Sequence, residues 1–312
     1  MTQAKNAARS WPALPLAEWS DTCDTLHLWT QMAGKVKLAL SPFQNHYWHV
    51  ALTLSARGLT TGPIPTNDGS FSIDFDFLDD RLVMSHCEGR EAVILLTPQS
   101  VAAFYARFTK ALRDVGVNVA ISTLPSEMPN PVPFEQDDEH ASYDGEYVRR
   151  WWYIQLETER VLRRHSATFV GKASPVLFYW GSFDLAQALY SGGPAPWIDG
   201  VPRFVAVAED RANVARGFWP GNTGMSGYTY GAPAFYAYTY PEPDGFKDQQ
   251  IPSATYVAEL GQFILPYDTM RTSADPERLL FDFYRATYEA AATLGGWDRE
   301  LLETRHPEAL AH

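Results

Sequence analysis

The same short motifs occur twice in this chain, in the same order, and the second occurrence lies near the middle of the sequence. The first copy contains Gly34-Lys35, Ser41-Pro42 and Tyr47-Trp48, and the second contains Gly171-Lys172, Ser174-Pro175 and Tyr179-Trp180. A helical pattern precedes each copy, and another helix follows it. Repetition at about half the chain length predicts two copies of one unit, packed as a pseudo-dimer. Chance recurrence of dipeptides is the alternative, and the shared order argues against it.

The predicted fold class is α+β, with two similar halves that each form an antiparallel sheet flanked by helices and are related by a pseudo-twofold internal repeat. The first repeat unit is expected over residues 1–123 and the second over residues 143–312. Residues 124–142 contain four prolines followed by an acidic run, a composition that excludes regular structure and predicts a linker. We expect a cleft or pocket where the two halves meet.

Periodicity and turn residues divide the halves into elements. The predicted helices cover residues 16–33, 98–115 and a segment after Asp275-Pro276, and the predicted strands of the first half cover residues 36–40, 46–56, 71–78, 82–86, 92–96 and 118–121. The first helix of each half is expected to end near its Gly-Lys pair. Thr97 is the expected N-cap of the helix over 98–115. Glycine- and proline-rich loops are expected within residues 192–243, including the stretch 228–240, and such long loops are typical of functional or mobile segments.

Composition and charge exclude several classes of protein. The chain has 312 residues, 46% of them hydrophobic, which is enough for a substantial core. Its net charge of −12 opposes a nucleic acid or an anionic membrane as partner, because both require clustered Lys and Arg. No apolar window approaches the roughly 20 residues of a membrane span, and no export signal is visible, so a cytoplasmic protein is expected. The sequence implies no particular cofactor or oligomeric state.

Two predicted strands carry polar residues on one face. In a strand over residues 46–56, alternation puts Trp48 on an apolar face and His49 and Arg57 on the opposite, polar face. In the strand over 71–78, Asp74 and Asp76 lie on the polar side. If the two strands share a sheet, these four polar residues lie together, and we expect His49 as a proton shuttle with the two aspartates as its catalytic partners and Arg57 as an anion anchor.

The alternative interpretation of this face is structural. Asp is disfavoured in strands, but a solvated face of an antiparallel sheet with Arg57 as counter-ion accounts for the same pattern. A metal site is not predicted. His46 and His49 point to opposite faces of a strand, and Cys23 and Cys87 lack the spacing of a thiolate zinc site.

Further candidate residues lie mostly in the second half. Gly181 occupies the place that corresponds to His49, so the halves differ at their most reactive position. Asp184 is an acid in an otherwise apolar strand. The predicted substrate-binding residues are Trp48, Arg57, Trp180, Asp184, Trp219 and Tyr238. The aromatic members of this set are suited to wall a pocket for a small organic molecule.

The chain lacks the motifs of the common nucleotide-binding and hydrolase classes, namely GxGxxG, a Walker lysine loop, GxSxG and HExxH. The leading hypothesis is an enzyme that uses acid–base chemistry on a small organic molecule in an aromatic-walled cleft. The alternative is a non-catalytic small-molecule binding or scaffold protein. Convergence of His49, Asp74 and Asp184 in one concave pocket would favour the enzyme.

The sequence resembles a family of bacterial proteins that is known only as a domain of unknown function. The resemblance covers nearly the whole chain and is carried by Gly34-Lys35, Asn45-His46-Tyr47-Trp48-His49, Gly171-Lys172, Ser174-Pro175, Trp180-Gly181-Ser182-Phe183-Asp184-Leu185, Gly217-Phe218-Trp219-Pro220-Gly221 and Leu265-Pro266-Tyr267. It implies a protein of about this length and brings no established activity. It also implies a His at Leu177, an Arg near Leu189 and a Ser-His-Glu triplet before Gly217, none of which this chain has. A family site built on them is lost or altered here.

Overall fold

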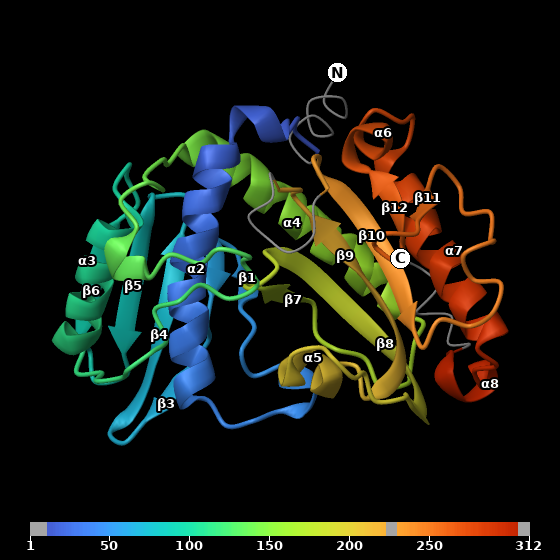
Figure 1. The fold of residues 1–312 in the computed structure, drawn as a ribbon, viewed down its shortest axis with the longest axis horizontal. Helices are drawn as coiled ribbons and strands as arrows, with labels where there is room; N and C mark the ends of the chain where they lie inside the picture. The colour runs from blue at the N-terminus through green and yellow to red at the C-terminus, as the bar shows by residue number, and fades with distance from the viewer. Residues whose placement is uncertain (1–10, 223–229, 305–312) are drawn as a thin grey trace.

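A computed structural model describes residues 11–222 and 230–304 of the chain. Its described part contains two six-stranded antiparallel sheets, flanked by helices and arranged side by side (Figure 1). The predicted α+β class with two sheet-containing halves is confirmed. The internal repeat and the unit boundaries at residues 123 and 143 stay predictions.

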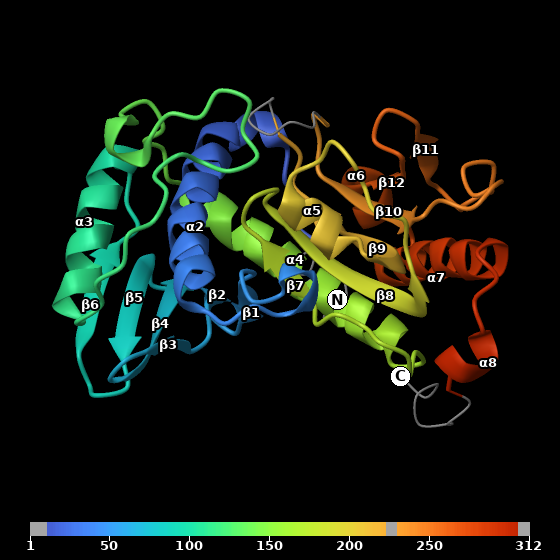
Figure 2. The same ribbon diagram turned by 60° about the horizontal axis from the view of Figure 1, so that its bottom comes forward.

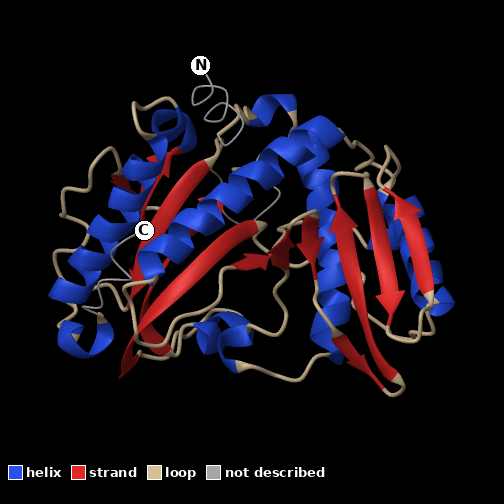
Figure 3. Cartoon of the chain, turned by 180° about the vertical axis from the view of Figure 1, so that it is seen from behind, coloured by secondary structure: helices blue, strands red, loops and turns tan. Residues whose placement is uncertain are grey.

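The first sheet has the order β1-β2-β4-β5-β6, with β3 paired to β4. Its strands are β1 (Thr53–Ser55), β2 (Gly58–Thr60), β3 (Ile64–Thr66), β4 (Gly69–Asp76), β5 (Arg81–His86) and β6 (Glu91–Leu95). Helices α2 (Ser20–Leu40) and α3 (Val101–Asp114) cover one face, and Figure 3 shows the other face from its uncovered side. On β4, Phe71, Ile73 and Phe75 are buried as their alternation predicts.

The second sheet has the order β11-β12-β10-β9-β8-β7. Its strands are β7 (Leu177–Tyr179), β8 (Asp184–Pro194), β9 (Arg211–Trp219), β10 (Ala234–Tyr240), β11 (Thr255–Val257) and β12 (Gln262–Pro266). The long helices α4 (Gly145–Ser166) and α7 (Pro276–Leu294) lie on one face, and the short helix α5 (Arg203–Ala208) lies over the opposite face (Figures 1 and 3). The remaining elements are η1 (Leu16–Glu18), η2 (Asn45–Tyr47), η3 (Phe134–Gln136), α6 (Tyr267–Arg271) and α8 (Arg299–Leu302).

The two sheets meet at their first strands. Just before β1, the backbone N–H of Leu52 donates to the carbonyl of Phe178 in β7 (2.9 Å), and the N–H of Phe178 donates to the carbonyl of Leu52 (2.8 Å). Helix α4 crosses behind this junction (Figure 2). Its Trp151 stacks on Phe183, with ring centroids 5.0 Å apart. The high aromatic content therefore serves in part to join the two halves in one core.

Two predicted strands are wrong, the first of them because helix α2 does not end at Gly34-Lys35. It continues to Leu40 and takes up the expected strand over 36–40, while only Thr53–Ser55 of the expected strand over 46–56 is extended. Gly34 is a packing position: a Cβ atom there would lie 2.1 Å from Nε1 of Trp180. The alternation argument therefore does not apply to residues 46–50, which form η2 and a turn.

The predicted start of α7 agrees with the structure, whereas the predicted start of α3 does not. Asp275 caps α7 by accepting from the N–H of Arg278 (3.0 Å), with Pro276 in the first turn as expected. The cap of α3 is Ser100 rather than Thr97, and residues 118–121 form no strand. The expected loops within 192–243 are largely occupied by β8, α5, β9 and β10, and residues 223–229 lie outside the described part.

Candidate functional site

A cavity of about 550 Å³ lies on the face of the second sheet that α4 and α7 do not cover. Alternate residues of three neighbouring strands form its floor: Asp184, Ala186, Ala188 and Tyr190 of β8, Asn213 and Ala215 of β9, and Tyr236 and Tyr238 of β10. The alanines are short, so the sheet surface is hollow between longer polar and aromatic side chains. The residues in between, such as Leu185 and Val214, are fully buried in the core.

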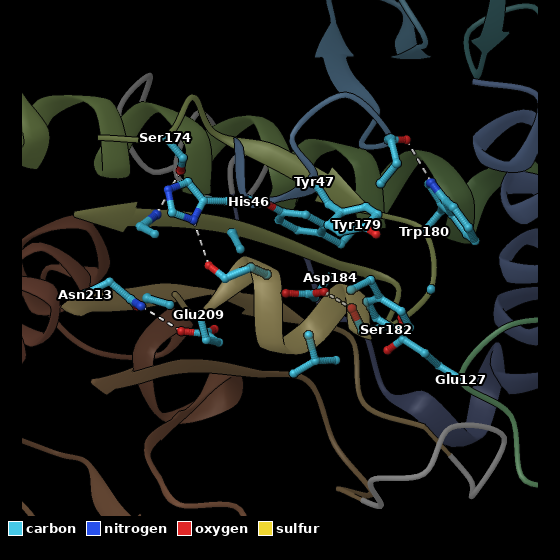
Figure 4. A pocket seen from close by; sticks show the side chains of 18 of the residues that line it. His46, Tyr47, Glu127, Ser174, Tyr179, Trp180, Ser182, Asp184, Glu209 and Asn213 are labelled. Atoms are coloured by element: carbon cyan, nitrogen blue, oxygen red, sulfur yellow. Dashed lines mark hydrogen bonds between the residues drawn. The ribbon is translucent and has the colours of Figure 1, made fainter. Parts of the chain in front are cut away.

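The walls come from all parts of the sequence. Helix α5 contributes Phe204 and Ala208, η2 contributes His46 and Tyr47 from the first half, and the proline-rich connection contributes Glu127. The cavity therefore combines the second sheet with residues from the first sheet's part of the sequence and from the proline-rich connection. Figure 4 shows its polar side chains, with Asp184 between Glu209 and Glu127 in that view.

Helix α2 positions the rim of the cavity. The side chain of Gln31 accepts from the N–H of Ser126 (2.7 Å) and donates to the carbonyl of the same residue (3.1 Å). Nε2 of His27 lies 2.9 Å from the carbonyl of Gly181 and donates to it. His27 is thus a buried histidine with a hydrogen-bond partner, and burial lowers its pKa to about 4.

Backbone strain is concentrated around the cavity. Six non-glycine residues of the described chain have positive φ, and four of them, His46, Tyr47, Glu127 and Phe183, lie in or next to the cavity wall. This conformation is unfavourable for residues with a Cβ, and for a ring as large as tyrosine it is a genuine outlier. Strained residues of this kind gather at functional sites, where the surrounding structure holds them in place.

Asp184 is buried at the centre of the floor. Both carboxylate oxygens accept hydrogen bonds from neutral donors, one from the hydroxyl of Ser182 and one from the hydroxyl of Tyr236. Gly217 makes room for that tyrosine, since a Cβ atom there would come within 2.8 Å of the Tyr236 hydroxyl. Burial raises the pKa of Asp184 above its ordinary value, and these hydrogen bonds only partly offset the effect.

Glu127 reaches the same cavity from the rim. Glu127 is exposed to solvent as a residue, whereas its carboxyl group lies against Gly181: its Oε1 is 2.0 Å from the position of a Cβ at Gly181. A side chain at position 181 would displace it, which gives a physical reason for glycine there. Burial of the carboxyl group, followed by repulsion from Asp184, raises the pKa of Glu127 to about 7.

Glu209 is the third carboxyl group of the cavity and follows the last residue of α5. It accepts from the hydroxyl of Tyr238 (2.9 Å) and from the side-chain amide of Asn213 (2.6 Å). Burial raises its pKa, and the two neutral donors lower it only in part. Tyr179, which also lines the cavity, interacts electrostatically with Asp184 and with Glu209.

His46 closes one end of the cavity in its neutral form. Its Nδ1 lies 2.9 Å from the carbonyl of Ala208, which requires a proton on Nδ1, and its Nε2 accepts from Nζ of Lys172 (2.6 Å). Burial lowers the pKa of His46, and the neighbouring Lys172 lowers it further. The imidazole ring also stacks on Tyr190, with centroids 4.5 Å apart.

The predicted substrate-binding residues divide into two groups. Trp180, Asp184 and Tyr238 line the cavity, and Nε1 of Trp180 donates to the carbonyl of Val50 (2.9 Å). Trp48 and Trp219 lie behind the cavity wall: Trp48 is 5.2 Å from the ring of His46, and Trp219 donates to the carbonyl of Ser182 (3.1 Å). Arg57 lies at the first sheet and does not line the cavity.

The predicted catalytic group is not assembled. Asp76 is bound by Arg57 (2.9 Å) and Arg81 (3.2 Å), while Asp74 accepts from Ser72 (2.6 Å). His49 is not in a strand. Its Nδ1 accepts from the N–H of Gln44 (3.3 Å), and its ring packs on Phe43 and Tyr47. The expected shared polar face is wrong for His49, and the alternative of Arg57 as counter-ion fits Asp76. Neither His49, Asp74 nor Asp76 lines the cavity.

Sequence reasoning missed Glu127 and Glu209. Glu127 lies in an irregular proline-rich stretch where no periodicity indicates direction. A usable pattern did exist on β8, where Asp184, Ala186 and Ala188 alternate with the larger residues 185, 187 and 189 and so predict a hollow face with an acid in it. The sequence pattern offers His46 only as a candidate metal ligand, whereas the structure places this residue in the cavity wall.

Within the described ranges, no group of three or more His, Cys, Asp or Glu side chains is arranged to hold a metal ion. No helix in these ranges is long and apolar enough to cross a membrane.

Comparison with known proteins identifies a family. Residues 11–304 match the profile of a family described as "Family of unknown function (DUF5996)". No curated protein and no solved structure matches the chain. The match spans both sheets, the cavity and the helices around them, so the chain belongs to DUF5996, a family of unknown function.

Proposed function

We propose that this protein binds a small organic molecule in the cavity of the second sheet and acts on it by acid–base chemistry. Glu127 is the proton donor and acceptor, and Asp184 is the second carboxyl group of the reaction. The observation that carries the proposal is the pairing of these two carboxyl groups in one cavity of about 550 Å³, with Glu127 held on a strained backbone.

The two carboxyl groups have different surroundings, and this difference suits a division of roles. A general acid or base works best when its pKa is near the working pH, and the pKa of Glu127 is raised to about 7 by burial and by Asp184. Asp184 receives two hydroxyl hydrogen bonds, from Ser182 and Tyr236, which orient it and favour its ionised form. Two carboxyl groups in one cavity, each with its own surroundings, are typical of acid–base active sites.

The proposal moves the chemistry away from His49, Asp74 and Asp76, whose catalytic role stays a prediction from sequence. Asp76 forms ion pairs with two arginines, which stabilise its ionised form and so oppose proton uptake by this carboxylate. His49 packs among aromatic rings beside the cavity without lining it. The second candidate function is binding without catalysis, which is favoured by the hydroxyl donors that already occupy both oxygens of Asp184.

The experiment is an untargeted search for substrate. The purified protein is incubated with a small-molecule extract of cells, and consumption of compounds is followed by mass spectrometry. We expect the wild type and the control variant Asp76→Asn to convert at least one compound to a product. Glu127→Gln is expected to convert the same compound at least ~100-fold more slowly, because general acid–base catalysis typically accelerates a reaction by about 10²–10⁴-fold. Equal turnover by Glu127→Gln would contradict the assignment, and retention of a compound without turnover would favour the binding protein.

A further inference from the structure

We propose that the ligand of this cavity is an organic cation, a protonated amine or quaternary ammonium group on a carbon framework. The inference rests on the proposed function and names its substrate class. Its cationic group would lie between Glu209 and Asp184, against the tyrosine rings of the floor. The argument has three parts, which concern the charges of the lining, the partners of the acids and the aromatic walls.

The lining has an excess of acidic groups. Glu127, Asp184 and Glu209 line the cavity, and among the described lining residues the only basic side chains are His46 and Arg203. His46 is neutral, because Nδ1 donates to the carbonyl of Ala208 and Nε2 accepts from Lys172. Arg203 begins α5 and is exposed to solvent. Lys172 and Lys35 do not line the cavity and bond the lining residues His46 and Ser126. Among the lining side chains, an anionic ligand would therefore face three carboxyl groups and one exposed guanidinium.

The acids have no cationic partner. In the part of the chain that the structure describes, the donors to Asp184 are the hydroxyls of Ser182 and Tyr236, and the donors to Glu209 are Tyr238 and Asn213, all of them neutral. Buried carboxyl groups are normally paired with a charge, because an unpaired buried charge is costly. A bound ammonium group would supply the missing charge and strengthen the ionised form of each carboxyl group.

The walls are suited to a cation with an apolar framework. Tyr179, Tyr190, Tyr236 and Tyr238 line the cavity, and the last two are stacked with ring centroids 6.3 Å apart. The faces of aromatic rings attract ammonium groups, an effect that strengthens when water is excluded. A volume of about 550 Å³ exceeds what an inorganic ion needs and lies in the range of cavities for small organic ligands.

The test uses matched probes on one framework: 3-phenylpropylamine, its N,N,N-trimethyl derivative, 3-phenylpropanol and 3-phenylpropionate, extended to the same four end groups on cyclohexyl and indole frameworks. Binding is measured by ligand-observed NMR and calorimetry in an amine-free buffer at pH 8. We expect the ammonium compounds to bind at least ~tenfold more tightly than the matched alcohols, and the carboxylates to bind most weakly, because a charged hydrogen bond or ion pair is worth more than a neutral one.

The variant Glu209→Gln keeps the shape of the side chain and removes its charge; its amide oxygen can still accept from Asn213, and its amide nitrogen can donate to the hydroxyl of Tyr238. We expect it to lose at least ~tenfold in ammonium affinity while the alcohols bind unchanged, and the surface variant Glu88→Gln to behave as wild type. Far-ultraviolet circular dichroism and thermal melting establish that each variant is folded. Alcohols that bind as tightly as the ammonium compounds, or no ammonium compound binding at millimolar concentration, would overturn the inference.

The outcomes also separate this inference from the proposed function. Ammonium selectivity that depends on Glu209, together with the absence of any reaction dependent on Glu127, would support the organic cation and refute catalysis. A reaction that depends on Glu127 and consumes a neutral or anionic compound would refute the organic cation and support catalysis.

Discussion

Both sheets of this protein carry aspartates on a polar face, but the aspartates of the two sheets have different hydrogen-bond partners. At the end of β4, Asp76 lies beside Arg57 and Arg81 and also accepts from the backbone N–H groups of residues 78 and 79. At the start of β8, Asp184 is buried, and its side-chain partners among the described residues are the hydroxyls of Ser182 and Tyr236. The first arrangement neutralises a charge at a turn, whereas the second leaves a buried carboxyl group in a cavity with neutral hydrogen-bond donors.

The pKa values move in opposite directions for physical reasons. Burial acts to raise the pKa of Asp76, but the hydrogen bonds from Arg57, the Asp79 N–H and Arg81 outweigh it and hold the pKa below its usual value. Burial also raises the pKa of Asp184, and there the hydroxyl donors are too weak to reverse it. An acid in a strand is therefore not by itself a functional signal; the cations within reach of it decide its role.

The largest effects are expected when the aspartate of each sheet is replaced by asparagine. Asp184→Asn is expected to weaken ligand binding by ~10–100-fold with unchanged or increased stability, because it removes a buried charge that lacks a cation. Asp76→Asn is expected to lower the free energy of unfolding by about 1–2 kcal/mol with unchanged binding, because it breaks two ion pairs that are largely exposed on the arginine side. Calorimetry measures ligand binding, and urea unfolding measures the free energy of unfolding. Equal changes in binding and in stability for the two variants would contradict the proposed difference between the two aspartates.

A second test fills the cavity without changing charge. Ala215→Leu places a larger side chain on the floor of the cavity and is expected to reduce ligand affinity at least ~tenfold, since it occupies the binding volume. Val83→Leu is the matched control on the outward side of the first sheet, where Val83 pairs with Asp74. It should leave affinity unchanged. Loss of affinity in the control, or retention in Ala215→Leu, would mean that the ligand binds elsewhere.

A third test uses the dependence of stability on pH. The pKa of Glu127 is about 7 in the folded protein against 4.5 for the ordinary group, so the folded state binds the proton more tightly. Its stabilising contribution is fully present below pH 4.5 and is lost as the pH rises through about 7. The melting temperature of the wild type should therefore fall relative to Glu127→Gln between these values. For Asp76, with a lowered pKa, stability is instead lost as the pH falls below its ordinary value of 3.8. A pH-independent difference between wild type and Glu127→Gln would refute the assignment.

The smallest effect is expected at the residue that the sequence singles out most clearly. His49→Ala should change ligand affinity by less than ~twofold, because His49 packs on Phe43 and Tyr47 and does not line the cavity. The substitution is expected to lower the melting temperature through lost ring packing. A loss of binding or turnover comparable with that of Asp184→Asn would restore the catalytic role predicted for His49 from the sequence.

The fold class followed from local patterns that the structure keeps. Alternation on Phe71, Ile73 and Phe75 marks the buried face of β4, and Asp275-Pro276 marks the start of α7. The failures arise where a tertiary contact overrides a local pattern. Gly34 resembles a helix terminator, but it is a buried helical position against which Trp180 packs, so α2 extends over the next predicted strand.

The site was only partly predictable for a related reason. Asp184, Trp180 and Tyr238 lie on or beside strands, where residue alternation carries directional information, and all three line the cavity. Glu127 depends on Gln31 of α2, which holds Ser126 from a distant part of the sequence. Contacts between segments that are so far apart in the chain produce no periodic pattern in a single sequence.

The most direct test of the account is a carboxyl titration by NMR. Protein labelled with ¹³C at the side-chain carboxyl groups of Asp and Glu is titrated from about pH 3 to pH 9, and the resonances are assigned with Glu127→Gln, Asp184→Asn, Glu209→Gln and Asp76→Asn. The account predicts a midpoint near 7 for Glu127, midpoints above the ordinary values for Asp184 and Glu209, and a midpoint below the ordinary value for Asp76. Titration of all three cavity carboxyl groups at their ordinary values would contradict the claim that this cavity holds the reactive acids of the protein.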